Sequence, residues 1–310
     1  MSDYEHLGHG VHHLDAHYIQ AGVASFYCIV EGDEVAIVDT GTSNSLPYLE
    51  RFLEDHDLSP EQVRYIMPTH VHLDHAGGAG VMMRACPNAS LVVHPRGARH
   101  MIDPARLIEG TIAVYGEDKF HRLYGEIPGI PAERVIKAND GDTFQLGQRA
   151  LQIIDAPGHA YHHYCVYDEV SQGIFSGDNF GVSYPNLVHD GKRVVIPTTT
   201  PVHFDPEALQ ITVTHLMDFK PQRIYLAHFN MLPNPASVVN QYKLWIDLFV
   251  HMTEMSRPDD DVGVGRLIDA IGEALQEEFD FSPVLINTQL RNDIQLNAEG
   301  LAVWYRNREH

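Results

Sequence analysis

Apolar residues alternate with polar ones, or cluster, along the first third of this 310-residue chain as they do in strands and short helices. Residues 11–38 predict three strands, HHLDAHYIQ, SFYCIV and VAIVD, and the turn EGDE between the last two is typical of a hairpin. Apolar residues at helical spacing predict a helix over residues 45–56, and the run VRYIM predicts a buried strand at 63–67. This pattern indicates an α/β fold.

The second half of the chain repeats the order of strand, loop and helix. The apolar runs predict strands in ALQIIDAPGH, in YCVYDEV, in GIFSGD ending at Asp178, and in RIYLAHF, a last strand ending in His228. Asp205 followed by Pro206 is typical of a helix start. Because α/β folds build their sites from polar residues at strand ends, Asp178 and His228 become candidate site residues.

The chain changes character after the sequence PNP at residues 233–235. Helical periodicity follows in three segments, residues 236–254, 262–279 and 293–308. We therefore predict an α/β domain of residues 1–235 and a C-terminal helical region of residues 236–310, which either covers the site or forms a homodimer contact. A further helical stretch, residues 95–125, is long enough to act as a lid over a site.

Composition narrows the classes of function. The net charge of −21 argues against nucleic acid as a partner, because such binding depends on Lys and Arg at phosphates. The chain has no run of 18 apolar residues that could cross a bilayer, and its start does not resemble a signal peptide. Its three cysteines lie scattered among apolar neighbours, which predicts reduced core residues. We expect a cytoplasmic protein that acts on a small molecule, without a membrane.

The most specific pattern is THVHLDHAGG at residues 69–78, directly after a predicted strand. It places His70, His72, Asp74 and His75 within six positions, and imidazole and carboxylate groups suit zinc, iron or manganese. Asp74 and His75 leave a tight loop in different directions, so they can serve a different ion from His70 and His72. The trailing Gly77-Gly78 lets the loop turn into the next helix.

Five motifs in the right order resemble those of the metallo-β-lactamase superfamily of metallohydrolases. They are VDTGT (38–42), THVHLDHAGG (69–78), APGHAYHH (156–163), FSGDN (175–179) and YLAHF (225–229). The segments HPRGARHMIDPARL and PTTTPVHFDPEAL are similar to an uncharacterised glyoxalase II-like group of hydrolases. The resemblance implies an αββα sandwich with a two-metal site at one edge.

The resemblance also implies a role for each matched residue. His70, His72 and His159 would hold the first metal ion, Asp74, His75 and His228 the second, and Asp178 would bridge them. Zinc is the first expectation for both ions, with iron or manganese as alternatives. A hydroxide held between two such ions would be the nucleophile, and Asp74 would also handle a proton.

Other residues have both a functional and a packing interpretation. Asp39 and His163 match residues that orient metal ligands, while Asp39 could also form only a turn. Tyr18, Tyr184 and Phe204 are candidates for the substrate pocket or, equally, for packing. His12, His13 and His17 lie on or near the first predicted strand, and we prefer a surface position for them over a place in the lining of the pocket.

We expect hydrolysis of a small ester, thioester or lactone. One alternative is similar to persulfide dioxygenases, which use a single iron, because His70, His159 and Asp178 would also serve that centre. Another alternative is a regulatory binding protein that retains the metal site and acts through its C-terminal helices.

Overall fold

The computed structural model describes residues 4–199 and 203–308 and divides into two compact units. The first unit comprises Met1–Asp155, His162–Gly177 and Pro221–Pro233, and the second comprises Ala156–Tyr161, Asp178–Lys220 and Asn234–His310. All three helical segments expected after residue 236 lie in the second unit, but that unit also includes residues from before the expected boundary. The assignment of domains to residues 1–235 and 236–310 stays a prediction.

A seven-stranded sheet forms half of the first unit's core, with the strands side by side in chain order. The strands are β1 (Tyr4–His6), β2 (Val11–Asp15), β3 (Ser25–Glu31), β4 (Glu34–Val38), β5 (Val63–Met67), β6 (Ser90–Val93) and β7 (Val135–Lys137). The predicted strands in residues 11–38 and 63–67 are confirmed. The hairpin is confirmed too, since Glu31 pairs with Glu34 across the two-residue turn Gly32–Asp33. The edge strand β1 was not predicted.

The strands β4 to β7 run parallel, and this direction positions the site. The carboxyl ends of parallel strands open at the same edge of a sheet. Asp39 follows β4, the sequence THVHLDHAGG follows β5 after one proline, and His94 follows β6. The candidate metal loop is therefore flanked by the segments that follow its two neighbouring strands.

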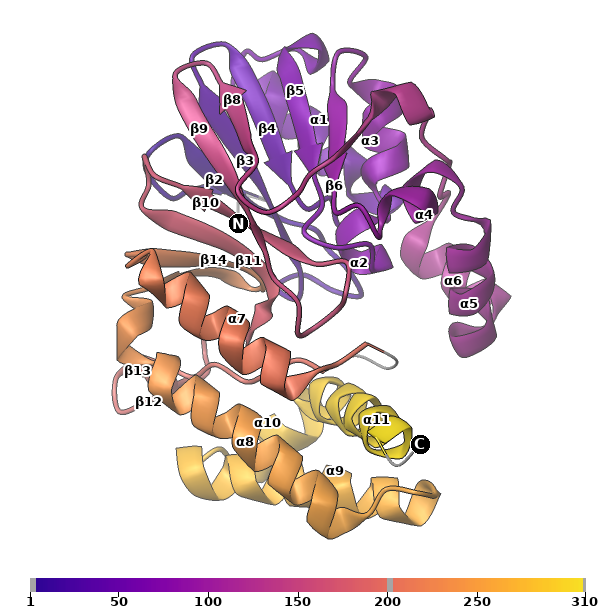
Figure 1. The fold of residues 1–310 in the computed structure, drawn as a ribbon, viewed down its shortest axis with the longest axis vertical. Coiled ribbons are helices and arrows are strands. Elements are labelled where there is room, and N and C mark those ends of the chain that lie inside the picture. Colours follow the sequence, from indigo (N-terminus) through magenta and orange to yellow (C-terminus); the bar gives the residue numbers. More distant parts are fainter. Residues whose placement is uncertain (1–3, 200–202, 309–310) are drawn as a thin grey trace. The chain divides into compact units, whose positions relative to one another are not determined.

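Helices cover one face of this sheet (Figure 1). They are α1 (Leu46–Asp55), α2 (Leu73–Ala76), α3 (Ala79–Ala85) and α4 (Ala98–Ile102), with short 3-10 turns at Ser43–Ser45, Pro60–Gln62 and Ala132–Arg134. The next helices, α5 (Ala105–Tyr115) and α6 (Glu117–Tyr124), lie beyond the edge of the sheet and pack with Leu73 of α2 in a separate apolar cluster. Alternate strand residues such as Leu14, Phe26 and Ile37 pack against Phe52 of α1 and Met82 of α3. The helical prediction for residues 95–125 is confirmed, and its role as a lid stays a prediction.

A six-stranded sheet completes the core of the first unit, in the order β15-β14-β11-β10-β9-β8. Its strands are β8 (Thr143–Leu146), β9 (Arg149–Asp155), β10 (Tyr164–Asp168), β11 (Gly173–Val182), β14 (Arg223–His228) and β15 (Asn230–Pro233). The opposite faces of β2 to β4, with Val11, Tyr27 and Val38, pack against Val166 and Phe175 of this sheet. The two sheets therefore share one apolar layer.

One strand end differs from the prediction, and the strand predicted to be the last is followed by another. β11 does not end at Asp178 but continues to Val182, because Val182 exchanges backbone hydrogen bonds with Ile196. β14 does end at His228, but it is not the last strand, because Asn230 begins β15 and pairs back onto β14. Asp178 thus lies within a strand.

The second unit is mainly helical (Figure 1). Its elements include α7 (Pro206–Asp218), α8 (Val239–Ser256), α9 (Asp261–Phe279), α10 (Pro283–Thr288) and α11 (Arg291–Arg308), with a 3-10 turn at Pro235–Ser237 and the short strands β12 (Val188–His189) and β13 (Lys192–Arg193). The predicted start of α7 is confirmed, since the Asp205 carboxylate accepts a hydrogen bond from the Ala208 N–H. Three C-terminal helices were predicted, and α10 is additional.

The surface interpretation of His12 and His13 is wrong, because both side chains are buried. The unpredicted strand β1 pairs outside β2 and makes it an interior strand. His12 packs against the rings of Phe52 and His56, and His13 lies 2.8 Å from the Ser25 hydroxyl through its Nε2. His17, in the loop after β2, is half-buried and stacks on Tyr48.

The cysteine prediction is confirmed, since Cys28, Cys86 and Cys165 are all free and buried. Within the described part of the chain, no helix combines the length and the apolar character needed to cross a bilayer. The cytoplasmic location stays a prediction.

A buried ion pair joins β9 to the end of β10. Arg149 is almost fully buried, and its guanidinium donates to both carboxylate oxygens of Asp168, with the Nε–Oδ1 distance at 2.8 Å. The same guanidinium donates to the His9 carbonyl. Arg149 therefore links the six-stranded sheet to the turn between β1 and β2 of the other sheet.

We expect the substitution Asp168→Ala to lower the free energy of unfolding by about 3–5 kcal/mol, because it removes the carboxylate that accepts two hydrogen bonds from the buried guanidinium and leaves only the more distant Glu31 carboxylate, at 3.8 Å. Urea denaturation of the purified protein measures this change. The control Arg51→Ala removes an exposed cation of α1 and should cost about 0.5 kcal/mol or less. Equal losses in both variants would contradict the account.

Candidate metal centre

The buried carboxylate of Asp39 fixes the loop that follows β5. Its Oδ1 accepts hydrogen bonds from the Thr69 backbone N–H at 2.8 Å and from the Thr69 hydroxyl at 2.9 Å. Its Oδ2 lies 3.4 Å from Nδ1 of His75. Asp39 thus holds both the start of the metal loop and one of its imidazoles, which is more than a turn residue would do.

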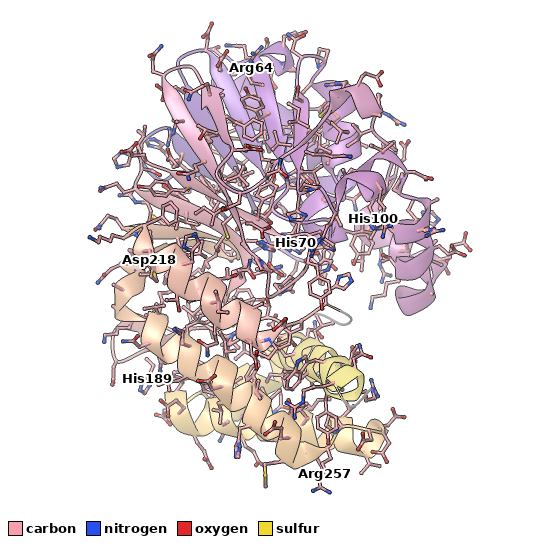
Figure 2. The ribbon with its side chains drawn as sticks, in the orientation of Figure 1. Arg64, His70, His100, His189, Asp218 and Arg257 are labelled. Atoms are coloured by element: carbon pink, nitrogen blue, oxygen red, sulfur yellow. The ribbon has the colours of Figure 1, made fainter. Side chains whose placement is uncertain are left out.

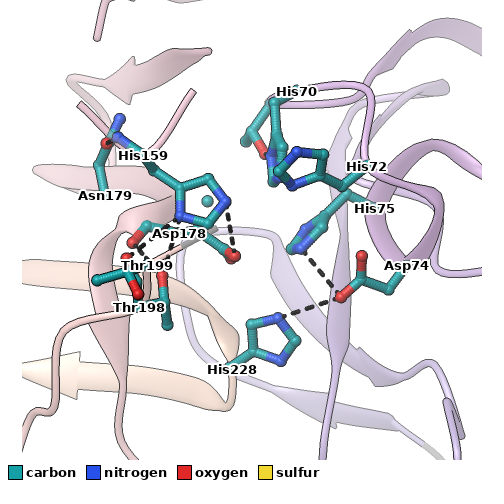
Figure 3. A network of polar contacts seen from close by, with 12 residues as sticks. His70, His72, Asp74, His75, His159, Asp178, Asn179, Thr198, Thr199 and His228 are labelled. Carbon is teal, nitrogen blue, oxygen red and sulfur yellow. Dashed lines mark hydrogen bonds and ion pairs between the residues drawn. The ribbon is translucent and has the colours of Figure 1, made fainter. Parts of the chain in front are cut away.

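Three predicted ligands converge within the first unit (Figure 3). Oδ2 of Asp74 lies 3.4 Å from Nε2 of His75 and 3.5 Å from Nε2 of His228. The donor atoms of all three residues lie within 4.8 Å of one another. Asp74 and His75 lie on the single turn of α2, whereas a loop was predicted there, and His228 ends β14.

Hydrogen bonds on the far side of each ring fix which nitrogen faces the cluster. Nδ1 of His228 lies 2.8 Å from the Val23 carbonyl, which can only accept, so Nδ1 carries the proton. Nδ1 of His75 faces the Asp39 carboxylate, which also accepts. In the neutral form both rings therefore present an unprotonated Nε2 beside the Asp74 carboxylate, as metal ligands do.

The spacing of these donors fits a metal ion. Metal–donor bonds of 2.0–2.1 Å in tetrahedral geometry place two ligand atoms about 3.3–3.4 Å apart. The Asp74–His75 and Asp74–His228 separations of 3.4 and 3.5 Å are close to that length. Two imidazoles and one carboxylate are also a donor set that suits zinc or iron.

The charge of Asp74 agrees with this role. Burial by itself would raise the pKa of the Asp74 carboxyl, but when His75 and His228 are protonated and no metal ion takes up their Nε2 atoms, their charges and hydrogen bonds outweigh burial and hold that pKa well below its ordinary value. Asp74 is therefore ionised at neutral pH, as a metal ligand or a proton acceptor must be.

His70 and His72 form a second group in the same unit. Nε2 of His70 lies 2.8 Å from Nδ1 of His72, and His70 is fully buried while His72 is half-buried. The Thr69 hydroxyl gives its proton to Asp39, so at 3.2 Å it accepts from Nδ1 of His70. His70 therefore turns an unprotonated Nε2 toward His72.

His163 and His162 lie against this group. The buried ring of His163 stacks on His70 with centroids 4.8 Å apart, which agrees with an orienting role. His162, which no motif singled out, lies parallel to His70 and perpendicular to His72 at 6.2 and 5.6 Å. The sequence pointed to His162 only through its position directly before His163 in APGHAYHH.

His159 and Asp178 lie together in the second unit (Figure 3). Nε2 of His159 is 3.3 Å from Oδ2 of Asp178, again close to the spacing expected for two ligands of one ion. Nδ1 of His159 faces the Thr198 carbonyl at 3.4 Å, which favours the proton on Nδ1 as in His228. The Asn179 side chain accepts a hydrogen bond from the His159 backbone.

The three pocket candidates lie in different surroundings. Tyr18 is half-buried, and its hydroxyl lies 2.8 Å from that of Tyr124 on α6. Tyr184 is buried and donates to the Asp293 carboxylate on α11, and Phe204 is buried. These contacts favour packing for Tyr184 and Phe204, and a pocket role for Tyr18 stays a prediction.

We expect the substitution Asp39→Asn to weaken metal binding about 10–100-fold, because it removes the carboxylate that holds Thr69 and orients the His75 ring. Competition with a chelator of known affinity measures the change. The matched control Asp118→Asn, at an exposed position on α6, should leave the affinity unchanged. Unchanged affinity in both variants would show that Asp39 only shapes the turn.

Comparisons with known proteins identify the family of the chain. Residues 19–228 match the family described as the Metallo-beta-lactamase superfamily. The chain is 27% identical over 224 residues to the Metallo-beta-lactamase fold-containing protein ST1585 of Sulfurisphaera tokodaii, covering 71% of this chain and 78% of that protein. The solved structure of ST1585 covers 98% of this chain and 100% of its own, with a TM-score of 0.66 and 22% identity, a likeness that concerns the fold alone.

Two further relatives have names that state an activity. Acyl-coenzyme A thioesterase MBLAC2 of Homo sapiens is 26% identical over 208 residues, which cover 61% of this chain and 67% of that protein. Hydroxyacylglutathione hydrolase of a Polaromonas species is 27% identical over 164 residues, which cover 52% of this chain and about half, 51%, of that protein. The predicted αββα metallo-β-lactamase fold with C-terminal helices is confirmed, and the chain belongs to the metallo-β-lactamase superfamily.

Proposed function

We propose that this protein is a metal-dependent hydrolase that cleaves a small thioester or ester and works with two divalent metal ions, zinc before iron or manganese. The observation that carries the proposal is the convergence of Asp74, His75 and His228, with both imidazoles presenting unprotonated nitrogens to one carboxylate oxygen. This cluster would hold one ion, and His70 and His72 would hold another.

The proposed ligand sets follow the matched motifs. His70, His72 and His159 would hold the first ion, Asp74, His75 and His228 the second, and Asp178 would be shared. The proposed role of Asp178 is supported by the packing of Gly177, the residue directly before it in the chain. The backbone of Gly177 lies so close to Thr69 and His163 that a Cβ on it would be 2.5 Å from the Thr69 hydroxyl oxygen and from Nε2 of His163.

Such ions, when bound, lower the pKa of a coordinated water and polarise a substrate carbonyl oxygen. The chain's own residues prepare the site for that chemistry. Asp39 and the Val23 carbonyl hold the His75 and His228 rings with Nε2 inward, and the ionised Asp74 carboxylate can also accept a proton. Burial of His70 and His75 keeps water away from the imidazoles.

The cysteines argue against a covalent thiol mechanism. Burial raises the pKa of the Cys86 thiol to about 12 and that of Cys28 well above its ordinary value, so neither provides a thiolate at neutral pH. Cys165 is buried and lies 3.6 Å from the Ser176 carbonyl, to which its S–H donates. A nucleophile from water is therefore the simplest interpretation.

The substrate class is proposed from the relatives. A thioesterase and a hydroxyacylglutathione hydrolase both act, by name, on acyl compounds, and they align with 61% and 52% of this chain. A thioester is therefore our first choice, before a lactone or another ester. The single-iron dioxygenase needs only His70, His159 and Asp178, and it leaves the cluster of Asp74, His75 and His228 without a purpose.

Elemental analysis of protein purified without added metal should find about two divalent ions per chain. The same sample should hydrolyse at least one member of a panel of acyl thioesters, lactones and phosphodiesters. One iron per chain, with oxygen uptake on glutathione persulfide, would replace the hydrolase by the dioxygenase. A metal-loaded protein inactive in both assays would favour the regulatory binding protein.

The substitution His228→Ala should reduce the metal content from about two ions to about one and lower kcat/KM for the thioester by about 100-fold or more, since it removes one ligand of the second ion. The control His215→Ala, an exposed histidine of α7, should keep both values. Full activity in His228→Ala with only one ion would refute the two-metal proposal.

A further inference from the structure

An asparagine is buried in the middle of the last helix of the second unit. Asn297 belongs to α11, and only 3% of its surface is exposed. Burying a side-chain amide is costly unless its polar atoms have hydrogen-bond partners. In Figure 2, Arg257 marks the end of α8, one of the helices against which α11 packs. The proposed function does not yet assign α11 or its asparagine a role.

The Asn297 side chain binds the chain on both sides of Thr198. Its Oδ1 accepts a hydrogen bond from the Thr199 backbone N–H at 2.7 Å, and its Nδ2 donates to the Pro197 carbonyl at 3.0 Å. The backbone carbonyl of Asn297 also accepts from the Thr199 hydroxyl at 2.8 Å. An N–H can only donate and a carbonyl can only accept, so the orientation of the amide is determined. One side chain therefore holds both neighbours of Thr198.

A glycine brings α11 against the same segment. A Cβ added to Gly300 would be 2.8 Å from the Thr199 hydroxyl oxygen and 2.9 Å from the carbonyl carbon and oxygen of Thr199. Only a residue without a side chain fits so close an approach. Gly300 lies three positions after Asn297 and therefore on the same face of the helix. This face of α11 fits the segment of residues 197–199.

Thr198 in turn contacts both candidate ligands of the second unit (Figure 3). Its hydroxyl donates to the Asp178 backbone carbonyl at 3.2 Å, so the same oxygen accepts from Nδ1 of His159 at 3.1 Å. The Thr198 carbonyl lies 3.4 Å from that Nδ1. Both oxygens of Thr198 thus favour the proton on Nδ1. The Nε2 of His159, 3.3 Å from the Asp178 carboxylate, is then unprotonated.

We propose that Asn297 is a positioning residue of the metal centre, which fixes Thr198 and through it the orientation and the tautomer of the His159 ring. The inference rests on the proposed function, in which His159 is a metal ligand. Groups that bind the outer nitrogen of a ligating histidine contribute to metal affinity, because they fix the ring and its tautomer. Asn297 acts one step further out, on the residue that makes those contacts.

The test measures zinc binding to the metal-free protein in competition with a chelator of known affinity. The variant His159→Ala first identifies the binding step that depends on His159. Asn297→Leu keeps the branched shape of the side chain and removes its hydrogen bonds, so the affinity of that step should fall about 10–100-fold. The other step should keep the affinity of the parent. An unchanged affinity, or an equal fall in both steps, would overturn the proposal.

The matched control is Asn287→Leu, at an exposed asparagine whose amide donates to a carbonyl of its own helix α10. It should leave both steps unchanged. If Asn297→Leu does not fold, Gly300→Ala decides, because alanine favours a helix while its Cβ displaces Thr199. Gly300→Ala should weaken the step that depends on His159, and an unchanged affinity in that variant would refute the role of α11.

A second measurement needs neither activity nor metal. Nitrogen-15 spectra of the histidine rings of the metal-free protein report the tautomer at mildly alkaline pH, where imidazole is neutral, and His159→Gln identifies the His159 signals. The parent should carry the proton on Nδ1, and Asn297→Leu should show a mixture of both tautomers. A His159 ring that is the same in parent and variant would contradict the proposal.

Failure of the proposed function has a different signature. If the parent protein binds no zinc, iron or manganese, the metal-dependent function fails. The tautomer of His159 in the metal-free protein then still decides whether Asn297 positions this ring.

Discussion

The interaction on which the candidate site depends is the pair of hydrogen bonds from Thr69 to the buried carboxylate of Asp39. Asp39 follows β4 and Thr69 lies two residues after β5, so these bonds join the carboxyl ends of two parallel strands. The same carboxylate faces His75, and the Thr69 hydroxyl in turn accepts from His70. One carboxylate therefore orients imidazoles in both predicted ligand sets of the first unit.

The remaining ring orientations come from backbone carbonyls. Val23 accepts from His228, and the Thr198 carbonyl lies next to the outer nitrogen of His159. A carbonyl cannot donate, so each one determines the tautomer of its histidine without a charged partner. The fold around the site therefore orients these imidazole nitrogens inward, and no bound ion is needed to orient them.

The sequence predicted the features that depend on residues close to one another in the chain. The strands of residues 11–38 and the start of α7 depend on neighbours in the chain. What was missed depends on distant partners. His12 and His13 are buried because β1 pairs outside them, and β11 runs past Asp178 because Val182 pairs with Ile196. The contact of His228 with Val23 spans 205 positions and leaves no local signal.

The central claim is that Asp74, His75 and His228 hold a metal ion, and anomalous diffraction tests it most directly. Crystals of protein purified without added metal would be measured across the absorption edges of zinc, iron and manganese. We expect an anomalous peak about 2.0–2.2 Å from Oδ2 of Asp74 and from Nε2 of both histidines. A peak at His70 and His72 with none at this cluster would contradict the claim.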